Sequence, residues 1–104
     1  MHLEIEANGT TLAVHVEGSG PAVLFIHGYP LDHRIWDPQL NGLEGWRRIA
    51  PDLRGFGHSP APAGVTGLAD YAADLGATLD ALEVEQAVVV GLSMGGYIAF
   101  ECLR

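Results

Sequence analysis

The sequence predicts an α/β fold with a mainly parallel sheet and an antiparallel hairpin at its N-terminus. Residues 3–16 alternate between apolar and polar side chains around Asn8-Gly9, the pattern of a two-stranded hairpin. Continuous apolar runs at 22–26 and 87–90 have the composition of strands buried on both faces. Helical periodicity separates the later strands, and strands that alternate with helices are joined by crossovers into a parallel sheet.

The expected order of elements is β-β-β-α-β-α-β-α. The segment 27–30, His-Gly-Tyr-Pro, carries turn residues that end the third strand. Asp37 followed by Pro38 predicts a helix N-cap with proline at the first helical position, and we expect this short helix to end near Gly45. A brief strand is expected next, over residues 47–50.

The clearest helix is predicted over residues 67–83, where the apolar period changes to 3.6. Its three aspartates, Asp70, Asp74 and Asp80, fall off the apolar stripe and are expected on the polar side. The stripe itself is made of Leu68, Tyr71, Ala72, Leu75, Leu79 and Leu82. Helical character returns from Gly95 to the end of the chain.

Composition excludes several classes of partner. The chain has 104 residues, a net charge of −8, and five Lys and Arg residues in total, all of them arginine. Nucleic acids and anionic membrane surfaces need clustered cations, so neither is expected as a partner. The 48% hydrophobic content suits either a sheet covered on both faces or a piece of a larger domain. We expect residues 1–104 to be a portion of one domain.

Localisation is predicted from cysteine usage and from the apolar runs. The single cysteine, Cys102, cannot form an intramolecular disulfide, and no run approaches the roughly 18 apolar residues of a membrane span. The first residues lack the basic and apolar regions of a signal peptide. The expectation is a cytoplasmic protein that does not bind a membrane.

Residues 91–95, Gly-Leu-Ser-Met-Gly, match the nucleophile elbow G-x-S-x-G. A predicted strand runs into the motif and a predicted helix leaves it, which is the context that the motif requires. Ser93 must stand on a tight turn, where Gly91 and Gly95 avoid side-chain collisions, and the helix N-terminus favours developing negative charge. The alternative is a serine in an ordinary strand-to-helix turn.

The loop that begins at His27 and Gly28 is the second candidate feature. An oxyanion hole needs two backbone donors, one from the residue after the nucleophile and one from the loop after the preceding strand. Met94 supplies the first, and Tyr29 is the expected second. A purely structural turn is the alternative for Tyr29.

Together with Trp36 and the loop 52–59, these segments resemble the α/β-hydrolase fold family. The similarity is to its small-esterase, enol-lactonase and cofactor-free haloperoxidase-like branches, and it extends over nearly the whole chain. It implies the first half of an α/β-hydrolase fold, truncated after the elbow helix, with no cofactor and no metal.

The resemblance also assigns roles to residues. Ser93 is implied as the nucleophile, and Asp52 and Arg54 as braces of their loop. Related dehalogenases and epoxide hydrolases carry aspartate at the nucleophile position, so Ser93 argues against those chemistries. The implied oxyanion amides and supporting residues are Tyr29, Met94, His27, Gly28, Gly91 and Gly95.

The chain departs from the family in its catalytic triad, which follows the order Ser, then Asp or Glu, then His. Glu101 is the sole acid after Ser93, and all five histidines precede the serine. His27 and His58 are expected near the mouth of the site in structural or exposed roles, not as the base. Asp32, His33 and Asp37 are expected as loop and cap residues, not as metal ligands.

The function expected from the sequence is a serine hydrolase that acts on an ester, thioester or lactone carbonyl through an acyl-enzyme. Without a base to activate Ser93, we expect the chain alone to be poorly active. A non-catalytic remnant or interaction module, and one half of a split enzyme, remain alternatives. Because the strand at 87–91 would present a free apolar edge, we expect self-association or docking of a complementing C-terminal half.

Overall fold

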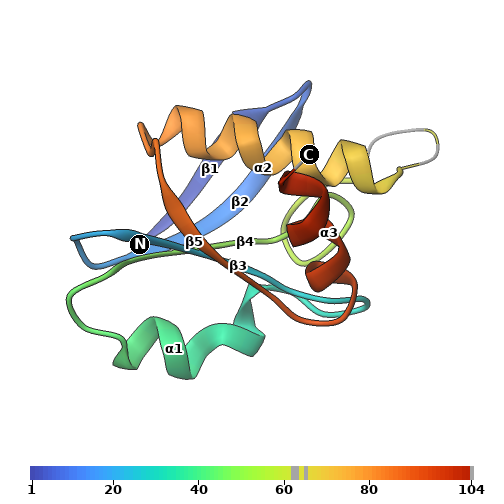
Figure 1. Ribbon diagram of the computed structural model, residues 1–104. Helices are drawn as coiled ribbons and strands as arrows, with labels where there is room; N and C mark the ends of the chain where they lie inside the picture. The colour runs from blue at the N-terminus through green and yellow to red at the C-terminus, as the bar shows by residue number, and fades with distance from the viewer. Residues whose placement is uncertain (62–63, 65, 104) are drawn as a thin grey trace.

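The computed structural model describes residues 1–61, 64 and 66–103, and within these ranges its elements follow the expected order (Figure 1). None of the helices in this part of the chain is long and apolar enough to cross a membrane. The elements are β1 (His2–Ala7), β2 (Thr10–Glu17), β3 (Ala22–Ile26), the 3₁₀ turn η1 (His33–Trp36), α1 (Asp37–Gly42), β4 (Arg47–Pro51), α2 (Leu68–Ala81), β5 (Ala87–Gly91) and α3 (Met94–Cys102).

The five described strands form one sheet in the order β1-β2-β4-β3-β5. Strand β3 pairs in parallel with both β4 and β5, whereas β2 is antiparallel to both β1 and β4. Only β2 therefore runs against the others within the described sheet. The predicted mainly parallel sheet with an antiparallel N-terminal hairpin is confirmed.

The hairpin turn forms where the sequence predicts it. Asn8 and Gly9 have φ angles of 53° and 81°, the left-handed conformation that a two-residue hairpin loop requires. Ala7 pairs with Thr10 directly beside this turn, which sets the register of β1 against β2.

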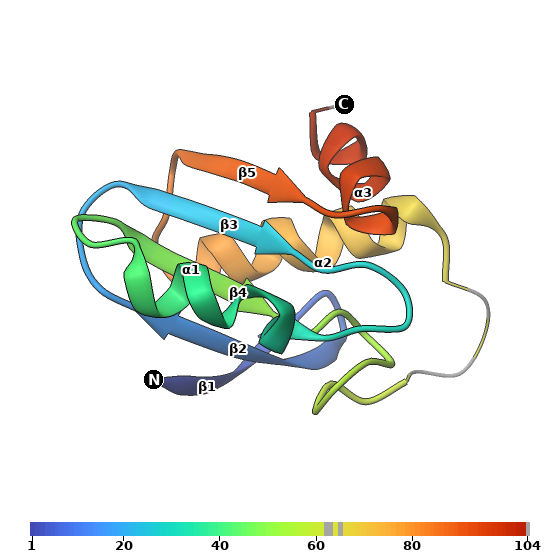
Figure 2. The same cartoon turned by 90° about the horizontal axis from the view of Figure 1, so that it is seen from below.

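Helices cover both faces of the sheet. Helix α1 lies on one face, and α2 and α3 lie on the other (Figures 1 and 2). Strand β3 is buried along its whole length because it lies between these two layers. Val23 and Phe25 pack toward α1, whereas Leu24 and Ile26 pack in the larger core under α2 and α3. Because β3 is covered on both faces, residues 22–26 are all apolar.

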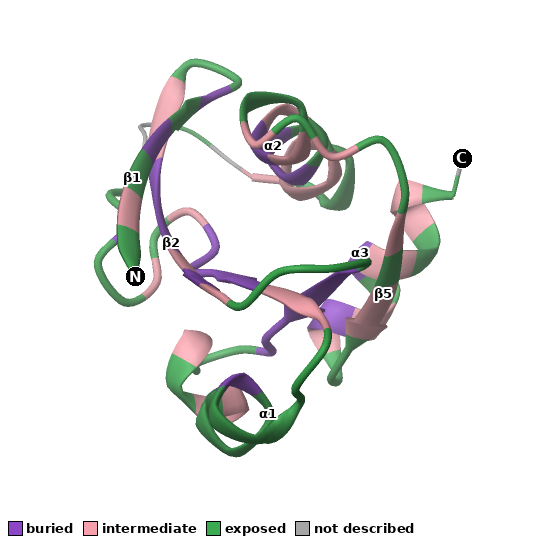
Figure 3. Cartoon of the chain, turned by 90° about the vertical axis from the view of Figure 1, so that its left-hand side faces the viewer, coloured by how far each residue is buried: buried purple, intermediate pink, exposed green. Residues whose placement is uncertain are grey.

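Strand β5 differs from the prediction, because the sequence indicated a strand buried on both faces. In the structure it is the last described strand of the sheet and pairs only with β3. Val88 is consequently 52% exposed, and every residue of the strand is intermediate or exposed (Figure 3). An apolar run shows that a strand is suited to burial, but the strand is buried only where neighbouring strands and helices cover it.

The start of the short helix also differs from the prediction. Asp37 is not an N-cap, because η1 runs directly into α1 and gives Asp37 a helical φ of −51°. Asp32 caps η1 instead, and its carboxylate accepts a hydrogen bond of 2.9 Å from the backbone N–H of Arg34. Helix α1 ends at Gly42 and not at Gly45.

The aspartates of α2 are not all on its polar side. Asp74 is 1% exposed, because Arg54 reaches it from the loop after β4. The guanidinium donates through two nitrogens at 2.6 Å each, and Asn8 adds an amide hydrogen bond of 3.1 Å. Helical periodicity cannot reveal this burial, since the compensating cation lies 20 residues away in the sequence.

Candidate active site

The candidate site lies at the carboxyl ends of β3 and β5. Parallel strands end at the same edge of a sheet, so the loop after β3 and the turn after β5 meet there. A hydrogen bond of 3.1 Å from the backbone N–H of Leu92 to the carbonyl of Ile26 joins the two segments.

Ser93 has the backbone geometry of a strained turn. Its φ of 56° and ψ of −115° lie in a region that residues with a side chain rarely adopt. Helix α3 begins at the next residue, Met94, and Ser93 itself is exposed. Within the described part of the chain, no hydrogen bond engages its hydroxyl group, which leaves Ser93 available for chemistry.

Two glycines let the turn pack against the end of β3. A Cβ at Gly91 would collide with the backbone carbonyl of Gly95. A Cβ at Gly95 would collide with the carbonyl of Ile26 and would lie 2.7 Å from that of His27. Backbone atoms cannot rotate away from such contacts, so this packing requires glycine at both positions.

Gly28 brings the loop after β3 directly against the serine. A Cβ at Gly28 would lie 2.8 Å from the carbonyl oxygen of Leu92 and 3.2 Å from the Cβ of Ser93. The absence of a side chain therefore lets the backbone of Gly28 approach the serine, and Tyr29 is the next residue of this loop.

Two backbone donors near Ser93 have no acceptor among the described residues. Met94 is the first residue of α3, where the N–H lies ahead of the helical hydrogen-bond ladder. The N–H of Tyr29 donates to no described backbone or side-chain acceptor. An exposed hydroxyl with two free amides beside it can accommodate the negative oxygen of a tetrahedral adduct. The assignment of these groups as nucleophile and oxyanion donors stays a prediction.

His27 is buried at the end of β3, and its partners determine its protonation. Its Nδ1 lies 3.0 Å from the carbonyl oxygen of Gly28, which can only accept, so Nδ1 carries the proton. Its Nε2 accepts a hydrogen bond of 2.9 Å from the backbone N–H of Leu53. Burial lowers the pKa of His27, which favours this neutral form. With both nitrogens occupied, His27 supports the loop and is not free to act as a base.

Aromatic contacts hold the same loop from outside. Phe56 meets the ring of His27 edge-on at a centroid distance of 5.5 Å and the ring of Tyr29 at 5.7 Å. Tyr29 is otherwise exposed, so its side chain forms part of the rim of the candidate site. The loop after β4 thus packs on the loop after β3.

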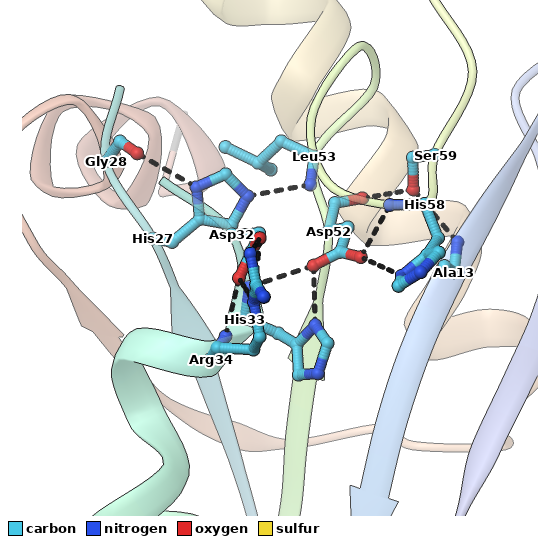
Figure 4. A network of polar contacts seen from close by, with 10 residues as sticks. All are labelled: Ala13, His27, Gly28, Asp32, His33, Arg34, Asp52, Leu53, His58 and Ser59. Carbon is cyan, nitrogen blue, oxygen red and sulfur yellow. Dashed lines mark hydrogen bonds and ion pairs between the residues drawn. The ribbon is translucent and has the colours of Figure 1, made fainter. Parts of the chain in front are cut away.

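Asp52 is the centre of the polar network in Figure 4. The carboxylate is fully buried and accepts hydrogen bonds from the backbone N–H of His33 at 2.8 Å, from its Nδ1 at 2.7 Å, and from the backbone N–H of His58 at 3.0 Å. Ser59 donates to the Asp52 carbonyl and accepts from the N–H of Ala13. Asp52 and Arg54 hold the 52–59 loop through separate contacts, which agrees with the bracing role implied by the resemblance.

None of the five histidines is hydrogen-bonded to Ser93. His33 and His58 lie against Asp52, His15 contacts Glu17 at 3.1 Å, and His2 lies edge-on to His58. A base that activates the serine is therefore not found among the described residues.

Ligand atoms of Asp32, His33 and Asp52 come within 4.8 Å of one another, which the sequence alone did not indicate. Each carboxylate has protein partners. Hydrogen bonds from Arg34 hold the pKa of Asp32 at about 2, and Asp52 accepts from His33. These contacts satisfy the cluster as a hydrogen-bond network around η1. No local pattern could have revealed it, because Asp52 and His33 are 19 residues apart.

Comparison with known proteins identifies the family. Residues 21–103 match the family described as alpha/beta hydrolase fold, and the chain belongs to this family. It is 44% identical over 96 residues to an epoxide hydrolase of Caballeronia sordidicola. Among solved structures it is similar to an epoxide hydrolase of Vigna radiata, with a TM-score of 0.94 and 35% identity, and to an esterase of Exiguobacterium antarcticum, with 0.93 and 36%.

The chain corresponds to only part of these proteins. It aligns over 88% of its own length with 29% of the Caballeronia protein. It covers 99% of its length in each structural match, but only 35% of the Vigna chain and 40% of the Exiguobacterium chain. The match establishes the fold of this portion and a hydrolase family.

Proposed function

We propose that the chain is the nucleophile-bearing portion of a serine hydrolase that acts on an ester, thioester or lactone carbonyl. The single observation that carries this proposal is the close approach of the Gly28 backbone to Ser93. An exposed serine in a strained turn stands there next to two amides, Tyr29 and Met94, that have no acceptor in the described chain. The family match supports the broader assignment to hydrolases.

The proposed reaction proceeds through an acyl-enzyme. Ser93 Oγ attacks the carbonyl carbon, and the amides of Tyr29 and Met94 stabilise the oxyanion of the tetrahedral adduct. The bond between the carbonyl carbon and the oxygen or sulfur of the leaving group then breaks. The alcohol or thiol leaves with the proton that the serine hydroxyl gave up. Water attacks the acyl ester, forms the carboxylic acid and restores the serine hydroxyl.

Several relatives carry the name epoxide hydrolase, which makes epoxide opening the competing proposal. The chemistry at Ser93 argues against it. A serine oxygen that opened an epoxide would become an ether, which has no carbonyl carbon for water to attack, so the enzyme would be trapped after one event. Serine at this position can turn over only if it forms an ester, which favours acyl substrates such as those of the esterase relatives.

The proposal requires an acid and a base from outside residues 1–104. All described histidines have other contacts, and the relatives extend well beyond the matched portion. We propose that a complementing C-terminal segment, in the same or another polypeptide, supplies both groups. An interaction module without catalysis is the alternative, and it predicts that Ser93 does not react.

Single-turnover acylation tests the proposed function. The chain is incubated with p-nitrophenyl acetate, and the modified residue is located by mass spectrometry. We expect slow acetylation of Ser93, abolished in Ser93→Ala and unchanged in Ser19→Ala, whose serine is exposed between β2 and β3. Labelling elsewhere, or equal labelling of Ser93→Ala, contradicts the proposal. So does steady turnover near the enzyme median of about 10 s⁻¹, which would require a base in this chain.

A further inference from the structure

The orientation of the Gly28–Tyr29 peptide group is set from its carbonyl side. The Gly28 oxygen accepts a hydrogen bond of 2.8 Å from the N–H of Leu31 and a second, of 3.0 Å, from Nδ1 of His27. In a planar trans peptide the C=O and N–H bonds point in opposite directions. The two hydrogen bonds therefore turn the N–H of Tyr29 away from His27 and Leu31 and leave it without an acceptor.

The ring of His27 is itself held by two contacts. Nε2 accepts from Leu53, and the edge-to-face contact with Phe56 fixes the plane of the ring. Leu53 and Phe56 both belong to the loop after β4, which is itself anchored through Asp52 (Figure 4). The orientation of one peptide group beside Ser93 thus depends on a loop more than 20 residues away in the sequence.

We propose that His27 is a positioning residue that presents the Tyr29 amide to the oxyanion, with its Nδ1–H bound to the Gly28 carbonyl. This inference rests on the proposed function, since it assigns a role within the same reaction. His27 touches no reacting atom. It acts by keeping the peptide group from rotating, so that little reorganisation is needed when the negative charge develops.

Two substitutions distinguish the roles of the two ring nitrogens of His27. The amide nitrogen of asparagine can occupy the place of Nδ1, so His27→Asn keeps the donor to Gly28 and loses the acceptor for Leu53. The terminal amide of glutamine reaches the place of Nε2, so His27→Gln keeps the acceptor for Leu53 and loses the donor to Gly28. His27→Asn leaves the buried Leu53 N–H unpaired and is expected to be the less stable variant.

The test is the rate of Ser93 acetylation by p-nitrophenyl acetate, measured by intact mass, together with urea unfolding of each variant. We expect His27→Gln to slow acetylation by about 10–100-fold, approaching the roughly 10²–10³ that loss of an oxyanion donor costs. We expect His27→Asn to slow it less than about threefold, although it is the less stable protein. His2→Gln, which changes an exposed histidine on β1 in the same way, serves as the control and should leave the rate unchanged.

The outcomes are distinguishable. Rates that follow stability, with His27→Asn slower than His27→Gln or equal to it, overturn the positioning role while the proposed function stands. If the unsubstituted chain is not acetylated at Ser93, the proposed function fails. In that case ¹⁵N NMR of His27 decides the geometry on its own: a protonated Nδ1 upholds the peptide orientation, and a protonated Nε2 overturns it.

Discussion

Arg54 and Asp74 form a two-pronged ion pair in which both nitrogen–oxygen distances are 2.6 Å. Asp74 is almost completely buried on α2, and Arg54 projects from the loop after β4. A hydrogen bond from Asn8 to the same carboxylate connects the turn of the N-terminal hairpin to this ion pair. One buried acid therefore joins a helix, a loop and a hairpin that are distant in sequence.

Removing one partner of this pair should strongly destabilise the fold. Asp74→Ala leaves the Arg54 guanidinium without its anion, and loss of one partner in a buried pair costs about 3–5 kcal/mol. Arg54→Met with Asp74→Leu removes both charges and should recover most of the free energy of unfolding. Urea denaturation of the single and double variants measures both effects. A single variant as stable as the unsubstituted chain contradicts the assigned role of the pair.

Gly95→Ala should prevent the native packing of the nucleophile turn. The new methyl group would meet the backbone carbonyls of Ile26 and His27, which cannot move without disturbing β3. We expect a loss of at least about 3 kcal/mol or failure to fold. The matched control is Gly76→Ala in α2, where a Cβ meets nothing within 4 Å. Alanine there should stabilise the helix by about 0.8–1 kcal/mol.

Stability should fall as the pH decreases below about 6.5, partly because of His27. Burial lowers its pKa from the ordinary value of 6.5, so below that pH the unfolded chain takes up a proton that the folded chain resists. The contribution of His27 to the free energy of unfolding is therefore complete above this pH. It is lost as the pH falls toward the lower pKa that His27 has in the folded chain. His27→Gln cannot titrate, so its decline between pH 7 and pH 5 should be shallower in urea unfolding.

His15 contributes in the same direction, because burial and the nearby N-terminus lower its pKa. His15→Gln therefore serves as the comparison variant, and it too should flatten the profile. An unchanged profile in His27→Gln would show that the buried ring is not a source of the acid sensitivity.

Among the described strands, β5 is paired along one edge only, and its other edge should make the isolated chain associate. Exposed Val88 lies on this edge, and a hollow of about 430 Å³ beside it is lined by residues that include Val89 and Phe100. Covering such apolar surface is favourable by about 25 cal/mol per Å². Light scattering across a concentration series at about 0.15 M salt, where charge repulsion reaches only about 8 Å, should detect association.

Val88→Lys should weaken this association, because a charged side chain on an edge strand opposes strand pairing. His2→Lys adds the same charge on β1 at the other edge of the sheet and should have little effect. A monomer at every concentration contradicts the prediction, as would equal effects of the two lysines.

Much of the fold follows from local patterns. The Asn8-Gly9 turn, the buried strand 22–26 and the helix over 68–81 each depend on residues close in sequence, so periodicity and turn chemistry determine them. The nucleophile turn is predictable for the same reason, since strand, glycines, Ser93 and helix occupy one short segment. The predicted strands and α-helices therefore occur in the predicted order, whereas the 3₁₀ turn η1 was not predicted.

What the tertiary structure decided is which segments became neighbours. Apolar periodicity shows that a strand or helix has a buried face, but it does not specify the partner across that face. The sheet order brings His27 to Leu53, His33 to Asp52 and Arg54 to Asp74, pairs separated by 26, 19 and 20 residues. The sequence by itself determined the strained turn that carries Ser93. Packing decided the environment of that turn, because burial of a polar group depends on partners that only the folded chain brings close.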